Sequence, residues 1–152
     1  MIFNKYFCFS LVSLMMLSSA HAIPNDTELY VRNTHASYVN RGMCSVAFDV
    51  QGYEPLYEME SIEFTVSLKD NKGNFHYTDT ATADDFNFVG GRTYGQFFIE
   101  GEEACNIFGG TITINKAIVK HNDGSKDEDI VKNKKLRIDD FKPMKIIISS
   151  KK

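Results

Sequence analysis

The chain has 152 residues, of which 43% are hydrophobic and 24% charged, and its formal net charge is −3. This mild acidity disfavours a surface that binds nucleic acid or anionic membranes, because both require a basic electrostatic field. A chain of this length can form one sizeable hydrophobic core but not two. We therefore expect a single domain whose partner is neither a nucleic acid nor a membrane.

The N-terminal segment has the three parts of a secretory signal. Lys5 makes a positive n-region, residues 6–16 are apolar, and residues 20–22 read A-H-A, which fits an A-x-A cleavage site. The apolar stretch is shorter than the roughly 20 residues of a membrane-spanning helix. We predict that residues 1–22 are a cleaved signal peptide and residues 23–152 the mature domain. Loss of Lys5 takes the net charge from −3 to −4, and the mature protein should be secreted or periplasmic.

Cleavage would remove Cys8 and leave one cysteine pair, Cys44 and Cys105. In an oxidising compartment an isolated pair is most simply a structural disulfide. Catalytic dithiols are usually close together as C-x-x-C, a spacing that this pair lacks. We predict a structural disulfide between Cys44 and Cys105.

Two early segments have the composition or periodicity of β-strands. Residues 28–33 are rich in Tyr and Val, and residues 44–50 alternate apolar with polar side chains. A period of two with one apolar face is typical of a half-buried strand. Cys44 belongs to the apolar face, so the disulfide should cross the interior or close its edge.

The clearest alternation covers residues 61–70, where four large apolar side chains alternate with polar ones. It ends at residues 70–74, and their sequence D-N-K-G-N suits a type I turn followed by a glycine with positive φ. The strand pattern resumes at residues 75–78. These three segments predict a β-hairpin.

The remaining strand patterns are less regular. Residues 92–100 hold several aromatic and aliphatic side chains, and residues 107–120 contain two alternating runs separated by a phase slip at Asn115 and Lys116. Such a slip predicts a β-bulge. Weaker strand signals follow at residues 130–131, 136–138 and 145–149.

Seven or so short strands, with turns roughly every 8 to 14 residues, are typical of a two-sheet sandwich. No window shows helical periodicity over three turns. We therefore predict an all-β fold, a small antiparallel β-sandwich of the fibronectin-III or immunoglobulin-like type with one disulfide. The chain has no Trp, which disfavours a true antibody-type domain because such domains pack a tryptophan on the disulfide.

The leading candidate for a binding site is the connection at residues 51–58, which read Q-G-Y-E-P-L-Y-E. It places Tyr53, Leu56 and Tyr57 around a proline. Exposed tyrosines are typical protein-contact residues, since the ring adds buried area at low entropic cost. The alternative is that Leu56 and one tyrosine cap the end of the sandwich.

A second candidate loop covers residues 84–88, which read D-D-F-N-F, with Gly90 and Gly91 beyond them. Either residues 51–58 or residues 81–91 could also open as a hinge for domain exchange between two copies. A compact monomer is the alternative.

No motif indicates catalysis or a cofactor. The histidines of the mature chain, His35, His76 and His121, are scattered without metal-ligand spacing, and phosphate-loop and nucleophile-elbow motifs are missing. Residues 123–129 form a D-x-S-x-D-x-D run, but the glycine and the final glutamate of a calcium loop are replaced by Glu128 and Lys134. We expect a solvated acidic turn there, no metal or cofactor, and a protein that is not an enzyme.

Several segments lie in a distinctive order along the chain. After the signal come Y-V-R-N at residues 30–33, N-R-G-M-C-S at residues 40–45, the alternating strand with its D-N-K-G turn at residues 62–73, and E-E-A-C at residues 102–105. This layout and cysteine placement over residues 27–106 resembles the interleukin receptor mimic protein family of Gram-negative bacteria.

The resemblance implies a small secreted fibronectin-III-like protein that is related in shape to cytokine-receptor domains, can form a domain-swapped homodimer and binds host interleukins. It transfers only Cys44 and Cys105, with no catalytic and no interleukin-contacting residues. Two alternatives stay open, a fimbrial or adhesin-type structural subunit and a periplasmic inhibitor protein. Residues 146–152 lack the near-terminal Tyr pattern of chaperone–usher subunits, which disfavours the fimbrial alternative.

Overall fold

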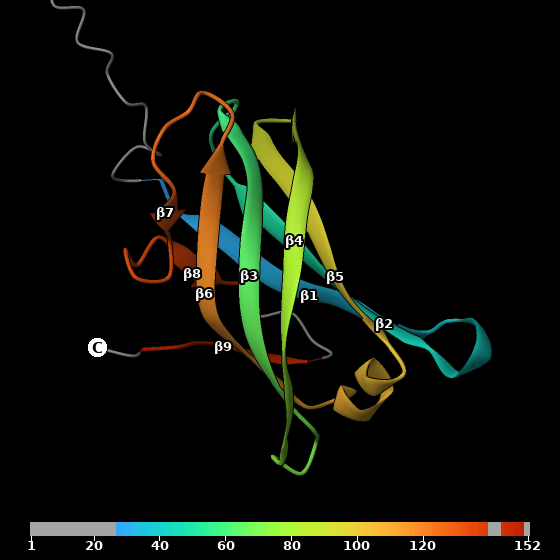
Figure 1. The fold of residues 1–152 in the computed structure, drawn as a ribbon. Helices are drawn as coiled ribbons and strands as arrows, with labels where there is room; N and C mark the ends of the chain where they lie inside the picture. The colour runs from blue at the N-terminus through green and yellow to red at the C-terminus, as the bar shows by residue number, and fades with distance from the viewer. Residues whose placement is uncertain (1–26, 140–143, 151–152) are drawn as a thin grey trace, which may run out of the picture.

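The computed structural model describes residues 27–139 and 144–150 (Figure 1). The predicted signal peptide, residues 1–22, lies outside the described residues. The described chain consists of strands, turns and two short 3-10 helices, which confirms the predicted all-β class. In this part of the chain, no helix is long and apolar enough to cross a membrane.

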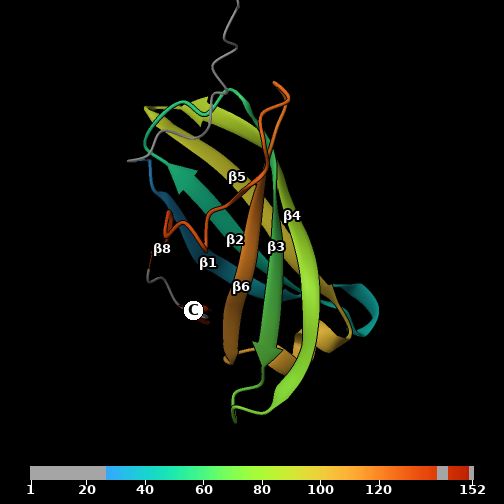
Figure 2. The same cartoon turned by 60° about the vertical axis from the view of Figure 1, so that its left-hand side comes forward.

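The strands form one sheet in the order β7-β6-β3-β4-β5-β2-β1-β8, with β9 beside β6. The sheet curls over so that β3, β4 and β6 face β1, β2 and β5 (Figures 1 and 2). The predicted sandwich is therefore confirmed as two layers of a single curled sheet. The strands of the described residues are β1 Leu29–Tyr38, β2 Cys44–Gly52, β3 Met59–Lys69, β4 Phe75–Val89, β5 Arg92–Gly101, β6 Thr111–His121, β7 Glu128–Asp129, β8 Leu136–Ile138 and β9 Lys145–Ile148.

Strand β4 joins the two layers. Its first part pairs with β3 as far as Ala83, and its last part pairs with β5 from Asp84 onwards. The sequence predicted a strand only at residues 75–78 and a loop at residues 84–88. That loop prediction was wrong, because Asp84 and residues 87–89 are held extended by pairing with β5. Residues 81–89 belong to strand β4, and the opening of residues 81–91 as a hinge for domain exchange stays a prediction.

Most strand pairs are antiparallel, but two pairs at the margins are parallel. Strand β8 runs parallel to β1, and β9 runs parallel to β6. A parallel pair joins segments far apart in sequence, because the chain must cross over before it pairs. The weak signals at residues 136–138 and 145–149 thus mark real strands, one added to each layer.

Two local predictions are confirmed. In the β3–β4 hairpin, the Asp70 amide donates to the Asn74 carbonyl at 3.0 Å, and Gly73 has φ 86°. In β6, Lys116 pairs with Thr65 and Ile114 with Val66, so Asn115 is the extra residue of a β-bulge.

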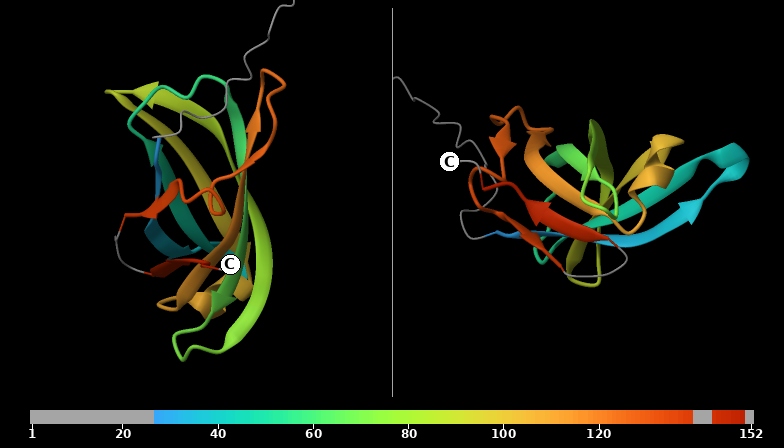
Figure 3. Two further views of the ribbon diagram at one scale, coloured as in Figure 1. Left: turned by 90° about the vertical axis from the view of Figure 1, so that its left-hand side faces the viewer. Right: turned by 90° about the horizontal axis from the view of Figure 1, so that it is seen from below.

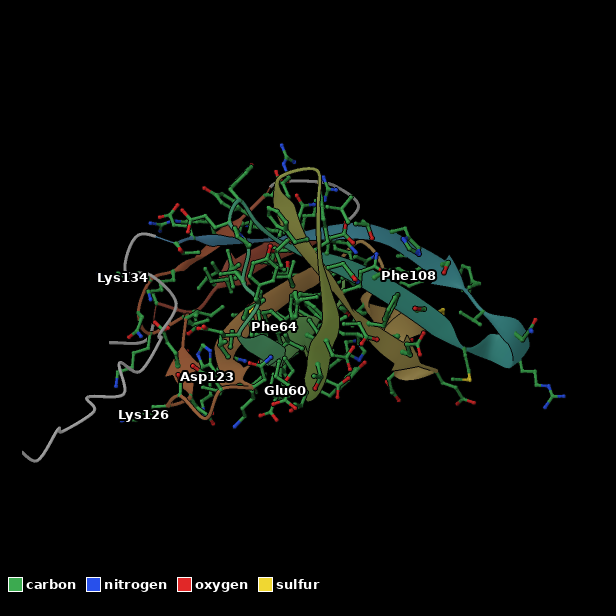
Figure 4. The ribbon with its side chains drawn as sticks, turned by 90° about the horizontal axis from the view of Figure 1, so that it is seen from above. Glu60, Phe64, Phe108, Asp123, Lys126 and Lys134 are labelled. Carbon is green, nitrogen blue, oxygen red and sulfur yellow. A yellow bond between two sulfur atoms is a disulfide. The ribbon has the colours of Figure 1, made fainter. Side chains whose placement is uncertain are left out.

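Three phenylalanines from both layers stack at the centre of the core. The ring centroid of Phe97 lies 4.6 Å from that of Phe48 and 4.4 Å from that of Phe64, and all three side chains are buried. In Figure 4, Phe64 lies among the crowded side chains between the layers, whereas Glu60 and Asp123 lie at the periphery. Burial of the three rings therefore joins the two layers.

The predicted disulfide is confirmed. Cys44 at the start of β2 is bonded to Cys105 in the 3-10 helix Glu103–Ile107, with their Cα atoms 5.0 Å apart. Cys44 is fully buried, as its place on the apolar face predicted. The bond joins the turn end of the β1–β2 hairpin, where Cys44 pairs with Tyr38, to this 3-10 helix. The same end of the hairpin extends beyond the other strands (Figure 3, right panel).

Candidate functional site

The two predicted contact segments meet at one end of the sandwich. The ring centroid of Tyr57, in the β2–β3 connection, lies 6.2 Å from that of Phe88, near the end of β4. Tyr53 and Tyr57 are 58% and 74% exposed, and Phe88 and Val89 are 40% and 66% exposed. We call these four residues the aromatic end.

Tyr53 is held from two sides. Its ring makes an edge-to-face contact with Tyr30 at 5.4 Å, and the Arg92 guanidinium lies 4.9 Å from its centroid. The Tyr30 hydroxyl donates to a Glu28 carboxylate oxygen at 3.2 Å, and this hydrogen bond, with burial, raises the pKa of Tyr30. These cation–π and ring contacts favour the observed position of the Tyr53 ring, although the residue is 58% exposed.

Hydrogen bonds fix the backbone of the same connection. The Thr93 hydroxyl donates to the Glu54 carbonyl at 2.6 Å. The Asn122 amide nitrogen donates to the Glu58 carbonyl at 2.9 Å, and its side-chain amide donates to the Tyr57 carbonyl at 3.2 Å. Strand β5 and the β6–β7 connection therefore support the loop, so its aromatic residues are presented in a defined arrangement.

Leu56 has a different position from the two tyrosines. It is half-buried and packs against the core, next to Gly52 of β2. Of the three predicted contact residues, Tyr53 and Tyr57 face solvent, whereas Leu56 caps the end of the sandwich.

An acidic hollow of about 520 Å³ lies on the outer side of β4 and β5, beside the aromatic end. One wall is already neutralised, because Asp49 accepts a hydrogen bond from Gln96 at 2.9 Å and pairs with the Arg32 guanidinium at 3.3 Å. The hollow is lined by Asp49, Asp84, Asp85, Asn87, Tyr94, Gly95, Gln96 and Phe98.

A β-bulge in β4 shapes this hollow. The register with β5 shifts between Asp84 and Asn87, so two residues of β4 are left without partners. Asp85 has φ 51°, and its carbonyl accepts a hydrogen bond from the Asn87 side chain at 2.6 Å. Phe86 turns inward against the core while its neighbours stay exposed. Strand pairing brings these residues beside β5, whose other neighbour is β2 with Asp49, an arrangement that the local sequence pattern did not reveal.

The tip of the β1–β2 hairpin is a second exposed apolar surface that the sequence analysis missed. Tyr38, Val39 and Met43 are 77%, 50% and 43% exposed. The Tyr38 ring contacts Phe108 at 5.2 Å, on the side of the disulfide. Two adjacent apolar residues at positions 38–39, just before a turn, are the sequence feature from which this exposed surface could have been predicted.

The acidic turn at residues 123–129 uses its carboxylates within the chain. Asp123 accepts hydrogen bonds from the Ser125 amide and hydroxyl, which lower the pKa of its carboxyl group. Asp127 pairs with Lys120, and Asp129 caps the following turn. Across residues 27–139 and 144–150, no group of three or more His, Cys, Asp or Glu is arranged to hold a metal ion.

A comparison with solved structures finds the same fold in another protein. The chain superposes on IrmA from Escherichia coli with a TM-score of 0.60 and 20% sequence identity, over 77% of this chain and 95% of IrmA. No family model and no curated relative matches the chain. The two proteins therefore share an overall fold despite widely different sequences.

Proposed function

We propose that this chain is a non-catalytic, receptor-like protein whose aromatic end binds another protein, a host interleukin. The observation that carries the proposal is the convergence of exposed aromatic side chains from two segments far apart in sequence. Aromatic residues supply much of the binding energy of protein interfaces. The fold shared with IrmA and the resemblance of residues 27–106 to the interleukin receptor mimic family support an interleukin as the partner.

The proposal also includes export of the protein. The signal-like sequence of residues 1–22 supports a secreted or periplasmic location, and so does the disulfide, which persists in oxidising compartments. We favour a binding protein over a fimbrial subunit, because such subunits take a strand from a neighbour. Here β9 of the same chain already lies along β6.

The test measures binding of the oxidised protein to a panel of immobilised interleukins. We expect at least one interleukin to bind with a micromolar or tighter Kd. The double variant Tyr53→Ala/Tyr57→Ala should weaken this binding by about thirtyfold or more, the effect of removing an interface hot spot. Phe75→Ala, an equally exposed aromatic residue at the β3–β4 hairpin, is the matched control and should bind like the wild type.

Two results would contradict the proposal. The first is that the wild-type protein binds no member of the panel at micromolar concentration. The second is an interaction that the Tyr53→Ala/Tyr57→Ala variant retains in full, which would place the contact on another surface, such as the tip of the β1–β2 hairpin.

A further inference from the structure

The acidic hollow carries unbalanced negative charge. Asp84 and Asp85 are both exposed on its lining, and none of the ion pairs among the described residues involves either carboxylate. Carboxylates in a concave surface hold a cation better than on a flat one, because the low-dielectric walls focus the field. The hollow therefore favours a positively charged occupant.

Aromatic rings and amides complete the lining. Tyr94 and Phe98 contribute rings, and Phe98 is 45% exposed although it lies in the middle of a strand. Asn87 and Gln96 contribute side-chain amides. A ring face attracts a cation that lies over it, and an amide oxygen accepts its hydrogen bonds.

The same surface already holds one guanidinium group from within the chain. Arg32 reaches across from β1 to pair with Asp49 on one wall of the hollow. A guanidinium is planar, so it can stack on a ring while its edge donates to carboxylates, which a lysine ammonium cannot do. Among the described residues, no group of three or more His, Cys, Asp or Glu could hold a metal ion, and this includes the carboxylates of the hollow.

We propose that the acidic hollow binds the guanidinium of an arginine on the partner protein, with Asp84 and Asp85 as acceptors and Tyr94 or Phe98 as the stacking surface. This inference rests on the proposed function, because the arginine belongs to the protein that covers the aromatic end. Asn87 pairs with Tyr94 and the next residue, Phe88, pairs with Thr93, so the hollow and the aromatic end adjoin. The partner therefore presents an apolar patch with an arginine at its margin.

The test uses a probe that needs no interleukin. The oxidised, 15N-labelled protein is titrated with N-acetyl-arginine-methylamide and, separately, with the citrulline counterpart, which has the same shape without the charge. We expect saturable shifts in the amide signals of residues that line the hollow. The arginine probe should bind about tenfold or more tightly than the citrulline probe, because charge-assisted hydrogen bonds are stronger than neutral ones.

Two double variants, each of which removes two negative charges, test whether the response depends on the hollow or on the net charge of the protein. Asp84→Asn/Asp85→Asn should abolish the response, and asparagine tolerates the positive φ of residue 85, so the fold should persist. Glu60→Gln/Glu102→Gln removes two exposed carboxylates outside the hollow and should respond like the wild type.

The inference is overturned if the arginine probe shifts no hollow residue, if citrulline acts equally well, or if Asp84→Asn/Asp85→Asn keeps the response. Failure of the proposed function has a different readout: the wild-type protein would bind no interleukin of the panel. If an interleukin binds through the aromatic end and Asp84→Asn/Asp85→Asn leaves its affinity unchanged, the hollow does not hold the partner's arginine and the inference fails alone.

Discussion

The ring of Phe86 covers Gly95 so closely that a Cβ atom at position 95 would lie 2.2 Å from a ring atom. The bulge in β4 turns Phe86 inward, and Gly95 on the neighbouring strand leaves room for the ring. The absence of a side chain at one position therefore permits the burial of a large side chain at the other. The exposed residues around Phe86, which line the acidic hollow, take their places from this contact.

Gly95→Ala should destabilise the protein by about 1–3 kcal/mol, the usual cost of overpacking. The measurement is the free energy of unfolding in urea. In a Phe86→Ala background the same substitution should cost much less, because the ring that it meets has gone. Equal costs in the two backgrounds would show that the contact does not limit the packing of β4.

Loss of the disulfide should cost about 4 kcal/mol in the chain-entropy model, since the bond joins residues 61 positions apart. The comparison is between the oxidised wild type and Cys44→Ala/Cys105→Ala in urea unfolding. The wild type in the presence of reductant serves as a second comparison. If the unfolding midpoints agree within error, the bond contributes no net stability and this prediction is wrong.

Leu56→Ala and Tyr57→Ala should have different effects, although the two residues are adjacent. Leu56 packs against the core, so its truncation should cost about 1–2 kcal/mol, less than at a fully buried site. Tyr57 is 74% exposed, and its truncation should change stability by about 0.5 kcal/mol or less. Urea unfolding measures both, and a larger loss for Tyr57→Ala would indicate that the tyrosine has a structural role.

Asp70 should make folding stability depend on pH in the acid range. A hydrogen bond from the Asn74 side chain, with further bonds from the Asn74 and Lys72 amides, lowers the pKa of Asp70 below its ordinary value of 3.8. A carboxyl group whose pKa is lower in the folded than in the unfolded state stabilises the fold at pH values above the unfolded-state pKa. This contribution is lost as the pH falls through the folded-state pKa. The stability advantage of the wild type over Asp70→Asn should therefore shrink below about pH 3.8.

The measurement is the urea midpoint of both proteins between pH 7 and pH 2.5. Asn74→Ala removes the side-chain donor and should reduce, without abolishing, the pH-dependent difference, because the two backbone amides still donate to Asp70. A difference between the wild type and Asp70→Asn that stays constant over the whole range would contradict the prediction.

Local patterns predicted the elements whose side chains alternate strictly. The strand ending at the Asp70 turn and the bulge at Asn115 could be read directly, because a period of two and its interruption are visible within a few residues. The rest of strand β4 could not, since residues 79–85 hold no apolar side chain larger than that of alanine, and residues 79–89 are extended through pairing with β3 and then β5. Tertiary pairing there overrides weak local preference.

The candidate site was predictable in its parts and not in its arrangement. Tyr53 and Tyr57 were identified from a loop rich in tyrosine, and Phe88 from a second polar segment. That Tyr57 lies beside Phe88 depends on strand order, which residue periodicity does not determine. The acidic hollow was missed for the same reason, because Asp49 comes from one strand pair and Asp84 from another.

Strand β4 has a further consequence for how the molecule opens. Strand β4 is hydrogen-bonded to β3 in one layer and to β5 in the other. Unfolding of either layer that releases β4 therefore also removes a paired strand from the other layer. The amides of β3, β4 and β5 should therefore exchange with solvent deuterium together, through a single global opening, rather than in two independent sets.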